Sequence, residues 1–145
     1  MKVAILGTVH PKGLEFLREN DLEVIEVKNF ENQSLKKELK FVDAILLRTS
    51  ILDKNILQHC NNLKIISRHG VGYDNVDLDY LNKRKIALGI TSTSNAVSVS
   101  EHVMSFFMYL TKNLSLSDSY VKQGNFDKRS ELPDIFELYK KKVLI

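Results

Sequence analysis

The chain has 145 residues, of which 43% are hydrophobic and 27% are charged, and its formal net charge is +3 at pH 7. These proportions are typical of a globular protein with one sizeable core, and they exclude a largely disordered chain. The mild positive charge does not favour nucleic acid as a partner, and no apolar run approaches the length of a membrane span.

Short apolar runs alternate with stretches of helical apolar spacing over the first ninety residues. The runs predict five strands, at residues 3–6, 22–27, 42–47, 63–67 and 86–90. Between them, apolar residues at helical spacing predict four helices, marked by Leu14 and Leu17, by Leu35 and Leu39, by Ile56 and Leu57, and by Val76, Leu78 and Leu81. Strands that alternate with helices predict right-handed crossovers, and therefore an α/β fold with a flavodoxin-like or Rossmann-like parallel sheet and helices on both faces.

The carboxyl ends of the predicted strands carry the residues of greatest chemical interest. Arg48 follows the third strand, and Arg68, Gly70 and Gly72 follow the fourth. Ligands of open parallel sheets collect at this edge. Glycines allow a tight turn whose successive N–H groups bind an anion, and two guanidinium groups suit a phosphate or a second carboxylate. The alternatives are a turn without a ligand and arginines paired with surface carboxylates.

The pattern changes after residue 90. A polar stretch at residues 91–95 predicts a loop, and Ser98 with Glu101 three residues later has the spacing of a capping box at a helix start. The following residues, 103–110, form a helix so apolar that it needs cover from another domain or subunit. We therefore expect one domain over residues 1–95 and a helical arm over residues 96–145.

The cysteine and histidine content indicates neither a disulfide nor a metal site. Cys60 is the only cysteine, which fits a reducing compartment, and it is interpreted as a buried small hydrophobe. His10 and His59 have no partners at ligand spacing. The first residues lack the features of a signal peptide, so the expected location is the cytoplasm.

Two segments carry a resemblance to a known family. Residues 68–77, Arg-His-Gly-Val-Gly-Tyr-Asp-Asn-Val-Asp, and residues 95–102, Asn-Ala-Val-Ser-Val-Ser-Glu-His, resemble the substrate loop and the interdomain helix start of the NAD-dependent D-2-hydroxyacid dehydrogenases. The resemblance implies that the backbone at Val71 and Gly72 holds the carboxylate of a 2-hydroxy or 2-keto acid. It also implies NAD as the cofactor, residues 1–95 as the substrate domain and a homodimer in the intact protein.

Within that family, the arginines are similar to those of the phosphoglycerate dehydrogenases. The resemblance implies that Arg48, Arg68 and Asn95 bind the distal group of the substrate, which makes 3-phosphoglycerate the first candidate substrate. It also places Val99 beside the nicotinamide. His69 and His102 match positions without a catalytic role, so no catalytic residue is assigned in this chain.

The last residues bear on whether the chain is active alone. Val143-Leu144-Ile145 has the apolar character of a starting strand, which in the family leads into the glycine-rich dinucleotide fingerprint. That fingerprint and the arginine, glutamate and histidine of the family's chemistry have no counterpart here, so we expect the chain alone to be inactive. The alternative is a non-catalytic binding or regulatory module of the same fold. A phosphoacceptor receiver domain is set aside because no acidic pair follows the first strand.

Overall fold

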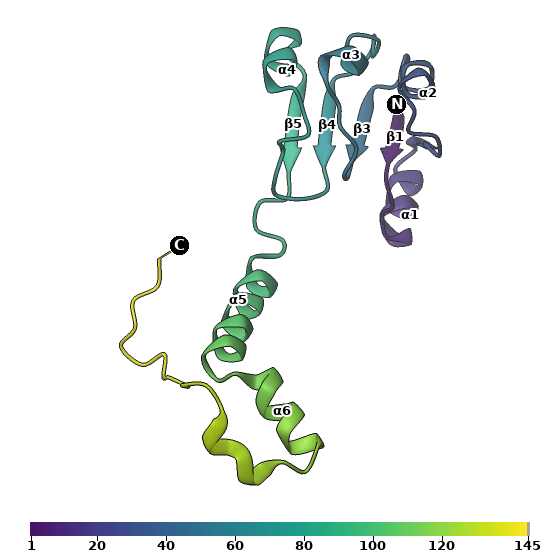
Figure 1. The fold of residues 1–145 in the computed structure, drawn as a ribbon. Helices are drawn as coiled ribbons and strands as arrows, with labels where there is room; N and C mark the ends of the chain where they lie inside the picture. The colour runs from purple at the N-terminus through teal and green to yellow at the C-terminus, as the bar shows by residue number, and fades with distance from the viewer. Residues whose placement is uncertain (145) are drawn as a thin grey trace. The chain divides into compact units, whose positions relative to one another are not determined.

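A computed structural model describes residues 1–144, and the chain divides into two compact units, Met1–Ser94 and the part from Asn95 onward. The first unit contains one five-stranded parallel sheet in the order β2-β1-β3-β4-β5 (Figure 1). All five predicted strands are confirmed: β1 (Lys2–Leu6), β2 (Glu23–Glu26), β3 (Ala44–Leu47), β4 (Ile65–Arg68) and β5 (Ala87–Ile90).

The strand register aligns the carboxyl ends of the sheet. Leu6 pairs with Leu47, Leu47 with Arg68, and Arg68 with Ile90. The residues that follow each strand therefore lie along a single edge, and Arg48 is one of them. This is the edge at which the sequence predicts a ligand.

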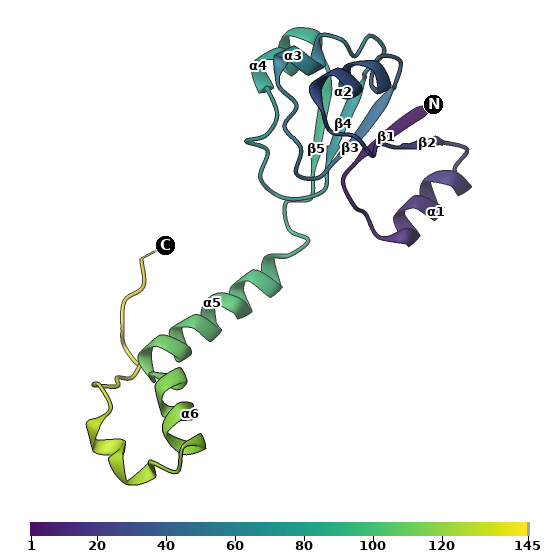
Figure 2. The same cartoon turned by 45° about the vertical axis from the view of Figure 1, so that its right-hand side comes forward.

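Four helices cover the sheet, on both of its faces as predicted. They are α1 (Pro11–Glu19), α2 (Asn32–Glu38), α3 (Lys54–Leu57) and α4 (Leu78–Arg84). Local capping explains where three of them start, because the His10 imidazole accepts a bond from the Lys12 amide, while the Asp53 and Asp77 carboxylates accept bonds from the amides three residues on. Figure 2 shows α1 on one side of the sheet and α2, α3 and α4 on the other.

Alternation along β1 divides the core between these two faces. Ala4 and Leu6 join the larger cluster under α2, α3 and α4, whereas Val3 and Ile5 pack with the apolar residues of α1. Successive side chains of a strand point to opposite faces, so a strand that is apolar throughout must be covered on both. The even apolar run at residues 3–6 is the sequence signal of this arrangement.

The second unit consists of α5 (Ala96–Thr111), α6 (Leu114–Lys122) and a short 3₁₀ helix, Phe126–Glu131. The capping box predicted at Ser98 is wrong, because α5 begins at Ala96 and Ser98 lies inside its first turn. The helix starts directly from the preceding turn, so the spacing between Ser98 and Glu101 falls within the helix. Gly124, with φ +71°, follows the end of α6, where a left-handed residue commonly ends a helix.

Most large apolar side chains of α5 are exposed within this chain, which agrees with the prediction that the helix needs cover from elsewhere. The strand predicted at residues 143–145 is not formed at Val143 and Leu144, and Ile145 lies outside the described residues. A lone strand has no hydrogen-bonding partner to fix it. Over residues 1–144, no helix combines the length and the apolar character needed to cross a membrane.

Candidate functional site

The loop after β4 depends on a glycine at position 70. Gly70 has φ +154°, and a Cβ atom there would overlap the guanidinium group of Arg68. Gly72 has no such constraint, because its Cβ would lie 3.7 Å from the nearest Asp74 carboxylate oxygen, an ordinary contact distance. The tight turn predicted from the two glycines therefore rests on the first of them.

Two successive amide groups at the tip of this loop have no acceptor within the described residues. The two amides before them are used: His69 donates to the Leu47 carbonyl at 2.8 Å, and Gly70 donates to the Arg68 carbonyl at 2.9 Å. The Tyr73 amide after them likewise has no acceptor among residues 1–144. The N–H groups of Val71 and Gly72 donate to no group in residues 1–144. Val71 is 42% exposed, so these two donors are available to an anion from solvent.

Arg68 lies against the inner side of the loop. Its guanidinium donates to the His69 carbonyl, and its Nε is buried with no hydrogen-bond partner in the part of the chain that is described. A cavity of about 220 Å³ lies beside it, lined by Thr49, Arg68, Gly72, Asp74 and Asn75. The Asn75 amide donates to the Ser50 carbonyl at 2.7 Å and so ties this loop to the one that follows β3.

Arg48 lines a second, neighbouring cavity. Its Nη1 donates to the Thr8 carbonyl at 2.9 Å. The cavity of about 350 Å³ is lined by Gly7, Thr8, Phe30, Arg48, Thr49 and Ser50. No carboxylate side chain lines it, and Thr49 borders both this cavity and the one beside Arg68. A guanidinium among hydroxyl-bearing residues is a chemical setting that favours an anion.

Four residues that line this cavity were not predicted from the sequence: Thr8, Phe30, Thr49 and Ser50. Thr8, Thr49 and Ser50 follow β1 and β3 within three residues, so the edge that indicated Arg48 also contained them. Phe30 carried no such signal. It lies in the loop between β2 and α2, and only the course of that loop brings it to the cavity.

Two other cavities have less convergent chemistry. One of about 250 Å³ is lined in part by His10, Ser67 and His69, so the structure places both histidines at one cavity. The other, of about 430 Å³, is lined by α4 residues, Asp77 and Lys54, a mixture of acidic and basic side chains. Neither contains the free amides of the β4 loop, and we take the arginine-lined edge as the candidate site.

The remaining residues of interest lie apart from this edge or in the second unit. Asn95 occupies the N-cap position of α5 without a side-chain bond, and Val99 is exposed in the first turns of that helix. Cys60 is fully buried, and burial raises the pKa of its thiol to about 11, which makes it a poor nucleophile. Within residues 1–144 no group of three or more potential ligands is arranged to hold a metal ion.

Comparison with known sequences shows which protein family this chain is similar to. Residues 3–135 match the family described as D-isomer specific 2-hydroxyacid dehydrogenase, catalytic domain. D-3-phosphoglycerate dehydrogenase of Archaeoglobus fulgidus is 28% identical over 130 residues, which cover 89% of this chain and 25% of that protein. A putative 2-hydroxyacid dehydrogenase of Staphylococcus saprophyticus is 30% identical over 132 residues, covering 88% of this chain and 41% of the relative. The chain thus spans less than half the length of these relatives.

Solved structures show the same fold. A protein from Pyrococcus horikoshii has a TM-score of 0.82 at 25% identity, over 95% of this chain and 43% of its own. D-lactate dehydrogenase from Aquifex aeolicus, solved with NAD and lactic acid, has a TM-score of 0.75 at 26% identity, over 92% of this chain and 40% of its own. The 3-phosphoglycerate dehydrogenase of Entamoeba histolytica with bound NAD⁺ has a TM-score of 0.66 at 25% identity, over 75% of this chain and 38% of its own.

Proposed function

Because the chain belongs to the D-isomer specific 2-hydroxyacid dehydrogenase family, we propose that the protein takes part in hydride transfer between NAD and C2 of a D-2-hydroxy acid. In this proposal Met1–Ser94 is the substrate-binding unit. The observation that carries the proposal is the pair of free, successive amides at Val71 and Gly72 on the carboxyl edge of the sheet. Two successive N–H donors suit the carboxylate that every 2-hydroxy acid has.

The distal group of the substrate lies on the arginine side of the loop in this proposal. The loop follows β4, Arg48 follows the neighbouring β3, and the Arg48 side chain reaches the Thr8 carbonyl after β1. The loop and this guanidinium are therefore one to two strand spacings, roughly 5–10 Å, apart along the edge. That separation suits a short acid with a second anionic group. A phosphorylated acid such as 3-phosphoglycerate is therefore the proposed substrate, with Arg48, Arg68 and Asn95 as the residues that bind its distal group.

The residues of this chain do not form the glycine-rich site that binds the pyrophosphate of NAD. The glycine pattern at Gly70 and Gly72 ends in Asn75 where a dinucleotide fingerprint has a third glycine, and the Asn75 side chain is committed to the Ser50 carbonyl. Val99 of α5 is the one residue proposed to contact the cofactor. We therefore expect the 145-residue chain alone to catalyse no hydride transfer, since it also supplies no assigned proton-transfer group.

The second unit is proposed to be the interdomain and dimerisation arm of a cytoplasmic homodimer. Its exposed apolar side chains on α5, which include Val103, Phe106 and Leu110, are the observation that supports an association. An apolar helix left in water favours contact with another surface.

The carboxylate site is tested by titrating the ¹⁵N-labelled chain with D-glycerate and following the amide resonances. We expect the largest shifts at Val71 and Gly72, because those N–H groups gain an acceptor. Shifts confined to other residues would contradict the proposal. Sequencing the source DNA past the codon for residue 145 discriminates a dehydrogenase from a non-catalytic module, since the former predicts an open frame with a glycine fingerprint and later arginine, glutamate and histidine codons.

The distal site is tested with Arg68→Ala in the intact enzyme. We expect this change to weaken binding of a phosphorylated acid by about tenfold, the effect of losing one charge-assisted hydrogen bond, and to leave lactate and glyoxylate nearly unaffected. The measurement is KM for each acid. Equal losses for both kinds of substrate would show that Arg68 only supports the loop.

A further inference from the structure

Arg48 is held toward the end of β1 by two features of the Gly7–Thr8 turn. Gly7 has φ +113°, and a Cβ atom built there would lie 2.8 Å from the Cβ of Arg48, closer than real Cβ contacts allow. The Arg48 side chain therefore begins directly against the bare backbone of Gly7. Its Nη1 then donates to the Thr8 carbonyl at 2.9 Å.

This arrangement determines the side of β3 on which the guanidinium lies. In the strand order β2-β1-β3-β4-β5, β1 and β4 flank β3 on opposite sides. The bond to Thr8 directs Arg48 over β1, into the cavity that Phe30 also lines, whereas Arg68 on β4 borders the other cavity. The two arginines thus line neighbouring cavities, which share Thr49.

We propose that Gly7 is a positioning residue for Arg48, and that the Gly7–Thr8 turn places the distal anion of the acid over β1 and β3. This inference rests on the function proposed above and adds the residue that orients the distal-group arginine. One N–H group of the guanidinium donates to the Thr8 carbonyl, and Arg48 lines a cavity that has no carboxylate side chain from residues 1–144 in its lining. A fixed fork of donors gives bidentate binding of an anion, which a freely rotating side chain gives less well.

The test compares two ligands that differ only in the distal anion, 3-phosphoglycerate and D-glycerate, each titrated into the 145-residue chain by NMR. We expect Gly7→Ala to weaken binding of 3-phosphoglycerate by about tenfold, because one charge-assisted bond is misplaced, and to leave D-glycerate unchanged. The double variant Gly7→Ala/Arg48→Ala should bind 3-phosphoglycerate no more weakly than Arg48→Ala, since both changes then act through one group. Additive losses, or equal losses for both ligands, would overturn the inference.

Gly124→Ala is the matched control for backbone strain. Gly124 also has a positive φ, +71°, but a Cβ there meets nothing within 4 Å. Gly124→Ala should introduce a similar backbone strain and leave the binding of both ligands unchanged. If the Gly124→Ala control also loses binding of 3-phosphoglycerate, the effect of Gly7→Ala would be explained by general destabilisation of the fold.

Arg48→Lys keeps the inference testable if Gly7→Ala does not fold. Arg48 is exposed, and a lysine there retains the charge without the fork, so it cannot hold the Thr8 carbonyl and grip an anion in bidentate fashion. We expect a loss for 3-phosphoglycerate close to that of Arg48→Ala, and full binding would overturn the inference. If Arg48→Ala does not weaken binding of 3-phosphoglycerate, both the proposed distal role of Arg48 and the positioning inference fail. If Arg48→Ala weakens it but Gly7→Ala and Arg48→Lys do not, only the positioning inference fails. An unmodified chain that binds neither ligand would overturn both.

Discussion

The two units of the chain differ in how their apolar residues are used. In Met1–Ser94, the apolar residues of the strands and helices form a core on both faces of the sheet, and every buried hydrophobic residue of the described chain lies between Val3 and Ile86. Among residues 95–144, Thr111 is the one buried residue, although α5 is more apolar than any helix before it. Apolar character in the sequence therefore has a different structural meaning on either side of residue 95.

This difference separates stability from assembly. A side chain buried within its own unit stabilises the fold of the single chain, whereas an exposed apolar side chain contributes only when another surface covers it. The sheet positions the candidate site, so the arginines and the β4 loop depend on the first unit. We expect substitutions in the two units to have effects of very different size.

The largest difference is expected between two leucine truncations. Leu47 is fully buried beneath α2, α3 and α4, whereas Leu110 on α5 is 67% exposed. Leu47→Ala should lower the free energy of unfolding by about 3 kcal/mol, through lost burial and the cavity left behind. Leu110→Ala should lower it by about 0.5 kcal/mol or less. Urea unfolding followed by circular dichroism measures both.

A volume-conserving change at the same position is the control for this comparison. Leu47→Met retains apolar volume and should cost less than about 1.5 kcal/mol. Equal losses for Leu47→Ala and Leu110→Ala would mean that α5 is covered within the single chain in solution, which would remove the distinction between the two units.

The next effect concerns the pH dependence of the buried core. Burial raises the pKa of the Cys60 thiol from 9.0 to about 11. The folded protein thus holds this proton more tightly than the unfolded chain, so its contribution to stability is complete below about pH 9 and is lost as the pH rises to about 11. The loss amounts to about 2 kcal/mol. Unfolding free energies measured from pH 8 to pH 11 should show it.

Cys60→Ala separates the thiol from the other groups that titrate in this range. The substitution should lower the free energy of unfolding by about 1 kcal/mol at pH 8, where the thiol is neutral and only its packing is lost. The variant's free energy of unfolding should decline less steeply than that of the unmodified chain above pH 9, so the two curves should cross between pH 9 and pH 11. Parallel curves would show that Cys60 does not ionise on unfolding in this range.

The sequence predicted the sheet well because its signals are local and repeated. The run of residues 42–47 is apolar enough to require burial on both faces, and β3 (Ala44–Leu47) lies at the centre of the sheet with Arg48 directly after it. The edge rule for parallel sheets then identified Arg48 and the β4 loop without any distance information.

The sequence could not predict the directions of side chains at that edge. Both arginines follow strands, but the Thr8 carbonyl and the loop containing Phe30 determine which cavity Arg48 lines. The bond from Arg48 to Thr8 joins residues 40 positions apart, and no spacing rule describes it. The capping box at Ser98 failed for a related reason, because a local pattern indicates a possible cap without specifying where the helix begins.

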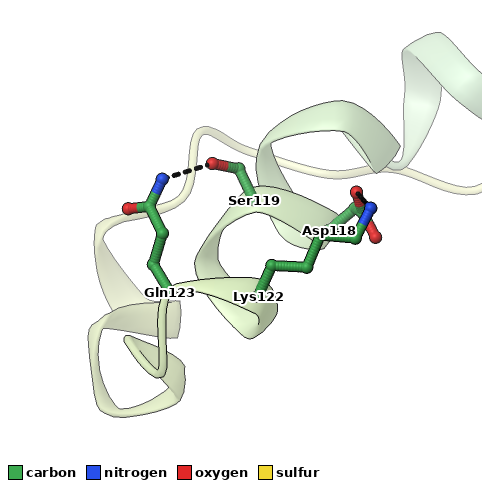
Figure 3. Close-up of polar contacts among 4 residues, drawn as sticks. All are labelled: Asp118, Ser119, Lys122 and Gln123. Carbon is green, nitrogen blue, oxygen red and sulfur yellow. Dashed lines mark hydrogen bonds and ion pairs between the residues drawn. The ribbon is translucent and has the colours of Figure 1, made fainter.

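The smallest effect is expected on the surface of α6. Lys122 lies 2.7 Å from the Asp118 carboxylate one turn earlier, and Gln123 donates to the Ser119 hydroxyl at 2.9 Å beside it (Figure 3). The ion pair is exposed, so Lys122→Ala should destabilise α6 by about 0.3 kcal/mol at low salt and by nothing measurable in 1 M NaCl. Amide hydrogen exchange in α6 measures the difference. Gln123→Ala is the control, because a neutral hydrogen bond is not screened by salt. A loss above about 1 kcal/mol for Lys122→Ala would mean that surface charge, and not packing, holds the second unit together, and the unit would then fold without any partner covering α5.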